Sequence, residues 1–348
     1  MDNRTKNIIY SLVLMGAVLL VGWYRRSSSA ASEPMKIEGQ TMGTSYHLTY
    51  FDEQKRDFKV SVDSLLKEVN KSINTYDPES EVSRFNRDAR GVKRALPYLV
   101  PPLEVAREVY DASEGAFDPT VMPLVNVWGF GPGRRLKMDS ARVDSIKAFV
   151  GFEKIQITKD SVLKSHPYTQ LDFGGIGQGY GADVIADFLE SKGISNMLVE
   201  LGGEGMAIGK NLKSGNPWEI GILDPASTYE NQFFKAYASI SNLSFTTSGN
   251  YFNFHEIDGV KYSHTIDPGT GFPSRKAILS ASVFAKDCTT ADAWGTAFMV
   301  MGHEKAIETA KAHPELHVFL MYSNENGKVE TFMTSNLEKI IKLEKETQ

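Results

Sequence analysis

The chain has 348 residues, with 38 Lys and Arg against 43 Asp and Glu, so its formal net charge is −5. Apolar residues make up 41% and charged residues 23%, proportions that are typical of globular proteins and exclude a disordered chain. The mild acidity excludes a broad nucleic-acid-binding surface, which needs an excess of Lys and Arg. A single cysteine, Cys288, excludes an intrachain disulfide and any zinc site built from cysteines.

The first 32 residues differ in composition from the rest. Residues 8–24 form an apolar run of 17 residues, at the short end of the roughly 17–25 that a membrane-spanning helix needs. Arg25 and Arg26 directly after the run favour an uncleaved anchor, while the Ser/Ala stretch that follows also fits a cleaved signal peptide. We therefore expect residues 1–32 to be a membrane anchor or signal segment. Residues 33–348 are expected to form one exported domain, anchored in the cytoplasmic membrane and facing the periplasm or the outer side.

Along residues 33–348, apolar periodicity and turn residues predict both strands and helices. Helices are expected at residues 62–73, 102–113, 183–192 and 290–301. Strands are expected at residues 35–51, interrupted by a turn at 41–44, and at 197–201, 218–223, 233–240, 278–284 and 316–322. Residues 251–257 and 260–266 flank Asp258-Gly259, a strong hairpin signal. Hairpins mixed with helices predict an α+β fold, a single domain of mixed, hairpin-rich sheets with flanking helices.

A glycine-rich segment at residues 171–181 connects an expected strand to an expected helix and contains five glycines within eight residues. Glycines let the backbone approach a ligand closely, and the helix that follows offers free N–H groups to an anion such as a diphosphate. Residues 177–182 also match the loose dinucleotide fingerprint, and the acidic Glu200 lies 23 residues after Gly177. A nicotinamide-dependent oxidoreductase is therefore one alternative, although the surrounding hairpins disfavour it. Glycines required only for tight packing are another.

Asp292 and Thr296 are four residues apart in an expected helix, so their side chains lie on one face, one turn apart. A carboxylate and a hydroxyl in this arrangement can ligate a hard cation such as Mg²⁺ or Ca²⁺, with backbone carbonyls and phosphate oxygens completing the shell. The alternative is an ordinary first helical turn, in which Thr289 or Thr290 caps the helix and Asp292 complements its dipole.

Three further segments carry candidate functional side chains. His264 lies where a strand runs into a Pro/Gly turn, and it could act as a general base or donate to a phosphate; a structural histidine is the alternative. Residues 75–86 form a polar turn whose Tyr76 could stack on a ring. Residues 115–120 place backbone groups and the carboxylate of Asp118 at the exit of a helix, where a base or ribose edge could be recognised. The last two segments could equally be ordinary turns.

Taken together and in this order, these segments resemble the FAD:protein FMN transferases, the ApbE-like family. The resemblance runs from about Met42 to about Gly302 and rests on the motifs MGTSY, TYDPESEVSRFN, GAFDPTV, LDFGGIGQGYGAD, VELGGEG, TSGNYFNF, YSHTIDPGTGFP and TTADAWGTA. Eight ordered motifs are far more specific than a single glycine pattern, so this interpretation displaces the nicotinamide-dependent one. It implies an α+β domain of that family's type, with a flavin site and a divalent metal at the diphosphate.

The resemblance also implies a reaction. Such enzymes split FAD at its diphosphate, attach FMN through a phosphoester to a Ser or Thr of an acceptor protein, and release AMP. The expected acceptor is a membrane electron-transfer subunit, and the expected metal is Mg²⁺ or another divalent cation such as Ca²⁺ or Mn²⁺. Two alternatives stay open: an FAD diphosphatase that gives free FMN and AMP, and an envelope protein that binds FAD without catalysis.

By position, the resemblance assigns roles to individual residues. The expected FAD contacts are Met42, Tyr76, Ala116, Phe117, Asp118, Asp172, Gln178, His264 and Ile266. The expected metal ligands are the carbonyl of Gly175, the carboxylate of Asp292 and the hydroxyl of Thr296. His264 and Asp292 are the expected catalytic residues. Which of the two takes the proton of the acceptor is left open, although a metal-bound carboxylate is less basic.

The chain departs from the family pattern at three points. Gln178 stands where a lysine is common, which removes a positive charge near the phosphates. Glu204 replaces the usual aspartate after the paired glycines. The apolar N-terminal run is not followed by the lipoprotein cysteine that many relatives carry. The first departure could change the strength of FAD binding, whereas the other two affect only details of the comparison with the family.

Overall fold

The computed structural model describes residues 10, 14–18, 20, 33–133, 135–136, 139–228, 230–249, 254–257, 260–263, 265–274 and 278–344. Among these residues, no helix combines the length and the apolar character that crossing a membrane requires. Most of the apolar run at residues 8–24 lies outside the described residues, so its role as an anchor or signal segment stays a prediction. His264 and the Asp258-Gly259 turn also lie outside them.

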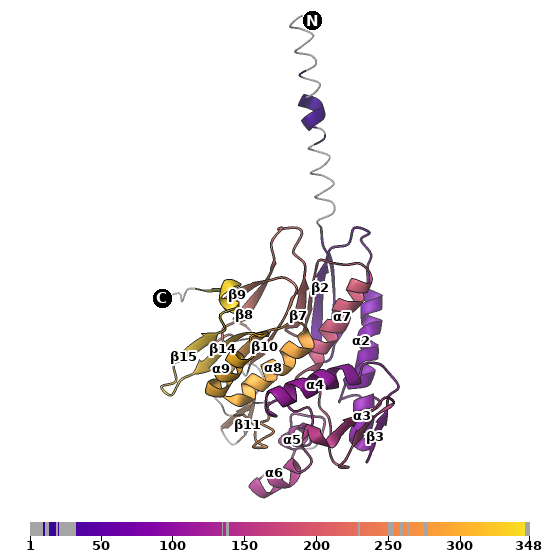
Figure 1. The fold of residues 1–348 in the computed structure, drawn as a ribbon, viewed down its shortest axis with the longest axis vertical. Helices are drawn as coiled ribbons and strands as arrows, with labels where there is room; N and C mark the ends of the chain where they lie inside the picture. The colour runs from indigo at the N-terminus through magenta and orange to yellow at the C-terminus, as the bar shows by residue number, and fades with distance from the viewer. Residues whose placement is uncertain are drawn as a thin grey trace, which may run out of the picture.

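An eight-stranded sheet runs through the molecule (Figure 1). In spatial order its strands are β1 (Met35–Thr41), β2 (Thr44–Tyr50), β6 (Met197–Leu201), β7 (Glu204–Ile208), β10 (Leu243–Gly249), β13 (Ile278–Phe284), β14 (His317–Ser323) and β15 (Val329–Met333). Every neighbouring pair is antiparallel, which confirms the α+β prediction. The dinucleotide interpretation of residues 177–182 is wrong, because β6 pairs antiparallel with both neighbours and belongs to no parallel βαβ unit.

Both faces of the sheet are covered, as the alternating residues of β14 show. Phe319 and Met321 pack against a small sheet, while Val318 and Leu320 pack against helices. The small sheet consists of β16 (Ile341–Leu343), β9 (Phe234–Ile240) and β8 (Trp218–Leu223). The helices of the opposite layer are α2 (Lys59–Ile73), α4 (Val100–Ala112), α7 (Gly177–Ser191), α8 (Cys288–Met301) and α9 (His303–Ala312) (Figure 1).

The remaining elements are short. They are helices α3 (Glu81–Arg87), α5 (Met122–Trp128) and α6 (Ser140–Lys147), the 3-10 turns Phe152–Lys154 and Leu337–Lys339, the sheet of β3 (Gly91–Lys93), β5 (Ser161–Lys164) and β4 (Ile155–Ile157), and the hairpin of β11 (Phe254–Ile257) and β12 (Val260–Ser263). In Figure 1, α3, α5, α6 and β3 gather at the lower end of the molecule.

The strands that were predicted agree closely with the structure, whereas β7 and β10 of the main sheet were not predicted. Strands β6, β8 and β13 begin and end at the predicted residues, and residues 35–51 form the two predicted strands with a turn between them. The predicted hairpin is also present, since β11 and β12 pair antiparallel. These segments could be predicted because their alternating side chains and turn residues are local features.

Helix α7 begins earlier than predicted, because most of the glycine-rich segment is itself helical. The predicted start was Asp183, whereas the helix begins at Gly177. Glycine weakens a helix by roughly 0.5–1 kcal/mol relative to alanine, but packing between helices requires it here. A Cβ on Gly179 would lie 2.3 Å from the carbonyl oxygen of Cys288 in α8. Tight packing, which the sequence left as an alternative, therefore explains Gly179.

Candidate active site

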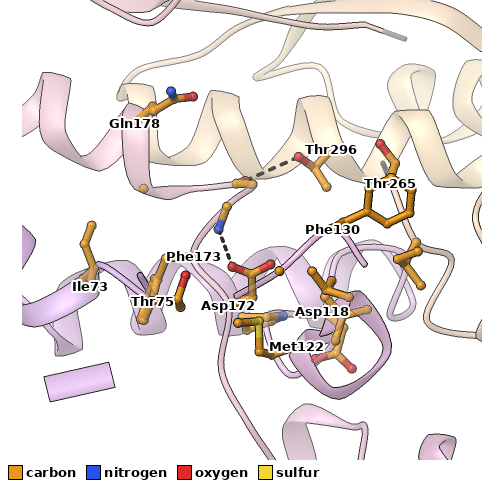
Figure 2. A pocket seen from close by; sticks show the side chains of 18 of the residues that line it. Ile73, Thr75, Asp118, Met122, Phe130, Asp172, Phe173, Gln178, Thr265 and Thr296 are labelled. Carbon is orange, nitrogen blue, oxygen red and sulfur yellow. Dashed lines mark hydrogen bonds between the residues drawn. The ribbon is translucent and has the colours of Figure 1, made fainter. Parts of the chain in front are cut away.

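A pocket of about 770 Å³ opens beside the start of α7, a volume typical of small-molecule sites. Its wall combines residues 73–76 at the end of α2, residues 116–119 and 121–122 leading into α5, the glycine-rich residues 172–175 and 177–178, residues 265, 266 and 268, and Thr296 of α8. Figure 2 shows side chains from these separate segments turned toward one space. The pocket is therefore assembled from elements that are far apart in the chain.

The pocket brings together most of the expected FAD contacts. Eight of the nine line it, namely Met42, Tyr76, Ala116, Phe117, Asp118, Asp172, Gln178 and Ile266. The ninth, His264, lies outside the described residues. Of the expected metal ligands, Gly175 and Thr296 line the same pocket, whereas Asp292 is buried one helical turn before Thr296.

Met42 reaches the pocket from the turn between β1 and β2. Met42 and Gly43 have positive φ angles of 50° and 75°, as the two central residues of a tight hairpin turn require. This backbone conformation is unfavourable for a residue with a side chain, so the turn holds strain at the pocket. The Met42 side chain extends to α7, where a Cβ on Gly181 would lie 3.2 Å from its Cε. Gly181 therefore leaves room for this methionine.

Tyr76 forms part of the wall from the loop that follows α2. The residue is 67% exposed, and its hydroxyl donates to the carbonyl oxygen of Phe130 at 3.2 Å. Oδ1 of Asn74 accepts a hydrogen bond from the Tyr76 N–H at 2.9 Å and so shapes this loop. An exposed ring held in this way offers a face on which a flat ring can stack. Phe130 was not among the expected FAD contacts, although its place among Gly and Pro at residues 129–133 signals a tight turn.

The charged side chains among the described lining residues are two carboxylates, those of Asp118 and Asp172. Oδ1 of Asp118 accepts hydrogen bonds from the N–H and the hydroxyl of Thr120 at 2.8 and 2.6 Å, and burial raises the pKa of Asp118 to about 6. Oδ1 of Asp172 accepts from the N–H of Gly174 at 3.0 Å (Figure 2), and burial raises its pKa as well. Because neither Lys nor Arg is among these lining residues, a diphosphate bound here needs positive charge from another source.

The start of α7 offers fewer free N–H groups than the sequence suggested. The N–H of Gly177 donates to the carbonyl oxygen of Phe173 at 2.7 Å. The N–H of Gly179 donates to Oδ2 of Asp292 at 3.0 Å. Between these two paired N–H groups, only the N–H of Gln178 has no hydrogen-bond partner among the described residues. The expectation that the helix start offers several free N–H groups to a diphosphate is therefore corrected, because the N–H groups of Gly177 and Gly179 already have partners.

Gln178 turns its side chain toward the sheet. In Figure 2 the side chain points away from Asp172. It lies against the turn between β6 and β7, where a Cβ on Gly202 would be 2.7 Å from Nε2 of Gln178. The residue that replaces a common lysine thus packs on a hairpin turn and brings no positive charge to the pocket.

Three oxygen donors lie where the glycine-rich segment contacts α8. Thr296 Oγ1 is 3.5 Å from the carbonyl oxygen of Gly175 (Figure 2), and Asp292 is one turn earlier on the same helix. A carboxylate, a hydroxyl and a carbonyl are the hard ligands that Mg²⁺ and Ca²⁺ prefer, so this donor set fits a divalent cation. Within the described part of the chain, no group of three or more His, Cys, Asp or Glu could hold a metal. Phosphate oxygens and water would therefore complete the shell.

The environment of Asp292 is unusual for a carboxylate. Burial is the main reason that its pKa is raised to about 7; the hydrogen bond from Gly179 lowers the pKa, and the negative charge of Asp183 raises it. A cation beside Asp292 would favour the charged form and counteract this cost. The surroundings of Asp292 therefore favour an ionised carboxylate only when a cation lies next to it.

The fold is shared with solved flavin transferases. The flavin transferase ApbE from Vibrio cholerae superposes with a TM-score of 0.79 and 34% sequence identity, over 88% of this chain and 99% of the other. The apo form of the flavinyl transferase ApbE from Pseudomonas stutzeri superposes with a TM-score of 0.77 and 31% identity, over 88% and 96%. Fold and pocket together therefore define a protein of the flavin transferase class.

Sequence comparison identifies the family. The model of the ApbE family matches residues 42–320. An FAD:protein FMN transferase from Vibrio cholerae serotype O1 is 35% identical over 323 residues, which cover 91% of this chain and 94% of the relative. A protein of the same name from Haemophilus influenzae is 32% identical over 336 residues, or 92% and 95%. The chain belongs to the ApbE family.

Proposed function

We propose that this chain is an FAD:protein FMN transferase that transfers FMN from FAD to a Ser or Thr hydroxyl of an acceptor protein. The reaction forms a phosphoester, requires a divalent cation and releases AMP. One observation carries the proposal: eight expected FAD contacts line one pocket, and three oxygen atoms that could ligate a cation lie beside it. These oxygens belong to Gly175, Asp292 and Thr296. The names of relatives that are 32–35% identical over most of their length support the same activity here.

The reaction exchanges one phosphate linkage for another. The hydroxyl oxygen of the acceptor forms a bond to the phosphorus of the FMN half, and the bond from that phosphorus to the bridging oxygen breaks. AMP leaves with the bridging oxygen, and the proton of the hydroxyl passes to a base. A divalent cation, when bound, offsets the negative charge of the diphosphate.

The residues of the chain bind and orient the two substrates. Asp292, Thr296 and the carbonyl of Gly175 would hold the cation, which would offset the negative charge of the diphosphate. Tyr76 supplies a face for one of the flat rings of FAD. His264 and Asp292 are the candidate bases for the hydroxyl proton, and His264 is favoured because a carboxylate that binds a cation is less basic.

We further propose that the enzyme is exported and anchored in the cytoplasmic membrane, with its pocket on the periplasmic or outer side. The apolar run at residues 8–24 and the arginines directly after it support an anchor. The proposed acceptor is a membrane electron-transfer subunit, which the family resemblance suggests. An anchored enzyme would meet such an acceptor at the membrane surface.

The activity can be tested with the full-length protein in detergent. It is incubated with FAD, Mg²⁺ and envelope proteins from its own source, and flavin fluorescence is then recorded on a denaturing gel. We expect a fluorescent band that requires Mg²⁺ and disappears with EDTA or in the Asp292→Asn variant. Asp187→Asn is the matched control, because Asp187 is an exposed residue of α7, outside the pocket, and should leave the band unchanged.

Other outcomes would select one of the alternatives. Release of AMP and free FMN without a fluorescent band would identify an FAD diphosphatase. FAD that stays bound and intact would identify a binding protein without catalysis. A band of full intensity in Asp292→Asn would contradict the role assigned to Asp292.

A further inference from the structure

Glu204 is a buried carboxylate for which the reaction above gives no role. It is the first residue of β7, directly after the Gly202-Gly203 turn, and it is only 8% exposed. Its Oε1 accepts a long hydrogen bond of 3.4 Å from the hydroxyl of Thr246 on β10. Its Oε2 is buried and has no hydrogen-bond partner among the described residues. Leaving a buried polar atom unpaired is costly, so this oxygen requires an explanation.

Glu204 lies next to the face of α8 that carries Asp292. Its partner Thr246 packs against Gly295 of α8, where a Cβ would be 3.3 Å from the Thr246 methyl group and 2.7 Å from Ser248 Oγ. Asp292 and Gly295 are three residues apart on α8 and therefore share one face. Strand β7 itself contacts α8, so Glu204 at the start of β7 lies close to this face.

Among the residues that the structure describes, the two carboxylates have no compensating positive side chain. Over the part of the chain that the structure describes, neither Glu204 nor Asp292 forms an ion pair with Lys, Arg or His. Buried charges of the same sign repel each other and have lost the solvation that water would provide. A divalent cation relieves both effects, because it carries two positive charges and accepts several carboxylate oxygens.

We propose that Glu204 is a second carboxylate of the divalent-cation site, with Oε2 turned toward the cation or toward a water molecule that the cation binds. This inference rests on the proposed cation dependence and adds one residue to the ligands expected from the family resemblance.

Cation binding can be measured directly, without FAD turnover. The full-length protein is titrated with Mn²⁺, with and without AMP to supply a phosphate, and free Mn²⁺ is followed by electron paramagnetic resonance. We expect Glu204→Gln to weaken Mn²⁺ binding at least about tenfold, as loss of a ligand or of a group that orients one does. Glu204→Asp should retain more affinity than Glu204→Gln, because it keeps the charge.

Glu200→Gln is the matched control for the loss of a negative charge on the same hairpin. The Glu200 carboxylate accepts from the N–H of Gly203 at 2.7 Å and contacts Nδ1 of His47 at 2.7 Å. It is therefore engaged on the hairpin itself and not toward α8. We expect Glu200→Gln to bind Mn²⁺ with the affinity of the wild type.

Thermal unfolding in EDTA separates this role from a structural one. Without a cation, Glu204→Gln removes one of two repelling carboxylates, so its melting temperature should equal or exceed that of the wild type. Added Mg²⁺ should raise the melting temperature of the wild type more than that of the variant. The variant would then bind the cation more weakly although its fold is at least as stable as the wild type. A residue that only supports the structure would not give this combination.

Three results would overturn the inference. An unchanged Mn²⁺ affinity in Glu204→Gln would exclude Glu204 while leaving the cation-dependent transferase intact. A lower affinity together with a lower melting temperature in EDTA would assign Glu204 to fold stability. A wild-type protein that binds no Mn²⁺ under either condition would overturn the proposed cation dependence as well.

Discussion

Asp183 on α7 and Asp292 on α8 each bind backbone N–H groups at the start of the other's helix. Asp183 accepts from the N–H groups of Cys288 and Thr289 at 2.8 and 2.7 Å, and Asp292 accepts from the N–H of Gly179 at 3.0 Å. Carboxylates at helix starts satisfy N–H groups that have no partner within the helix, and they complement the helix dipole. This exchange fixes the register of α7 against α8 and so determines where α8 presents its oxygen donors.

Asp183→Asn should lower the free energy of unfolding by roughly 1–3 kcal/mol. An amide has only one oxygen acceptor, and its NH₂ group would face the N–H donors of α8. Asp187→Asn is the control, because this exposed residue lies one turn later on the same helix, and its effect should stay within about 0.5 kcal/mol. Urea unfolding followed by circular dichroism measures both variants. Equal losses would show that the bonds between the helices add little stability.

Thr296→Val keeps the shape of the side chain and removes its hydroxyl. If Thr296 binds the cation, the Mg²⁺ concentration for half-maximal FMN transfer should rise roughly 10–100-fold. The melting temperature in EDTA should change little, because the hydrogen bond to Gly175 is long at 3.5 Å. Thr290→Val, in the first turn of α8 and outside the pocket, is the control. An unaltered Mg²⁺ requirement in Thr296→Val would remove this residue from the site.

Tyr76→Ala should weaken FAD binding by roughly 1–3 kcal/mol, the contribution of stacking between an aromatic side chain and a base. Tyr76→Phe should bind FAD nearly as well, since it keeps the ring and loses only the bond to Phe130. Quenching of flavin fluorescence measures the affinity. Tyr168→Ala is a matched control, because Tyr168 is 64% exposed and lies outside the pocket. Similar losses in both alanine variants would argue against a ring contact at Tyr76.

Asp118 should make the fold less stable as the pH rises from about 4 to about 6. Burial raises its pKa in the folded state to about 6, above the value of about 4 that an unfolded chain has, so the folded state binds the proton more tightly. The stabilisation by this proton is complete below about pH 4 and is lost as the pH rises through 6, by at most about 3 kcal/mol. Asp118→Asn should flatten this part of the profile in urea unfolding. If the free energy of unfolding has the same pH dependence in the wild type and in Asp118→Asn, the raised pKa assigned to Asp118 is wrong.

Helices α2, α4, α7 and α8 and the predicted strands could be recognised because their signals are local, whereas α3, α5, α6 and α9 were not predicted. Alternating side chains and turn residues located β6, β8, β13 and the Met42-Gly43 turn without reference to any other part of the chain. The ordered motifs also identified eight of the residues that meet in the pocket, since each motif lies in one short segment. Nothing local, however, indicated how the segments are oriented toward one another.

The start of α7 shows why the rest depended on tertiary structure. Glycines at residues 177, 179 and 181 oppose a helix on local grounds, yet all three are helical. Helix α8 packs against Gly179 at a distance that no side chain would allow, and Gly181 leaves room for Met42. For the same reason the N–H of Gly179 is taken by Asp292, 113 residues later, and is not free for a diphosphate.

Composition, periodicity and motif order were sufficient for the α+β class, the family resemblance and eight of the residues that line the pocket. Only the packed structure showed that Glu204 is buried beside Asp292 and that the described pocket lining carries no Lys or Arg. Local patterns report the preferences of neighbouring residues for helix, strand or turn. Burial and charge environment depend on which distant segments the sheet and helices bring into contact, and that is decided by packing.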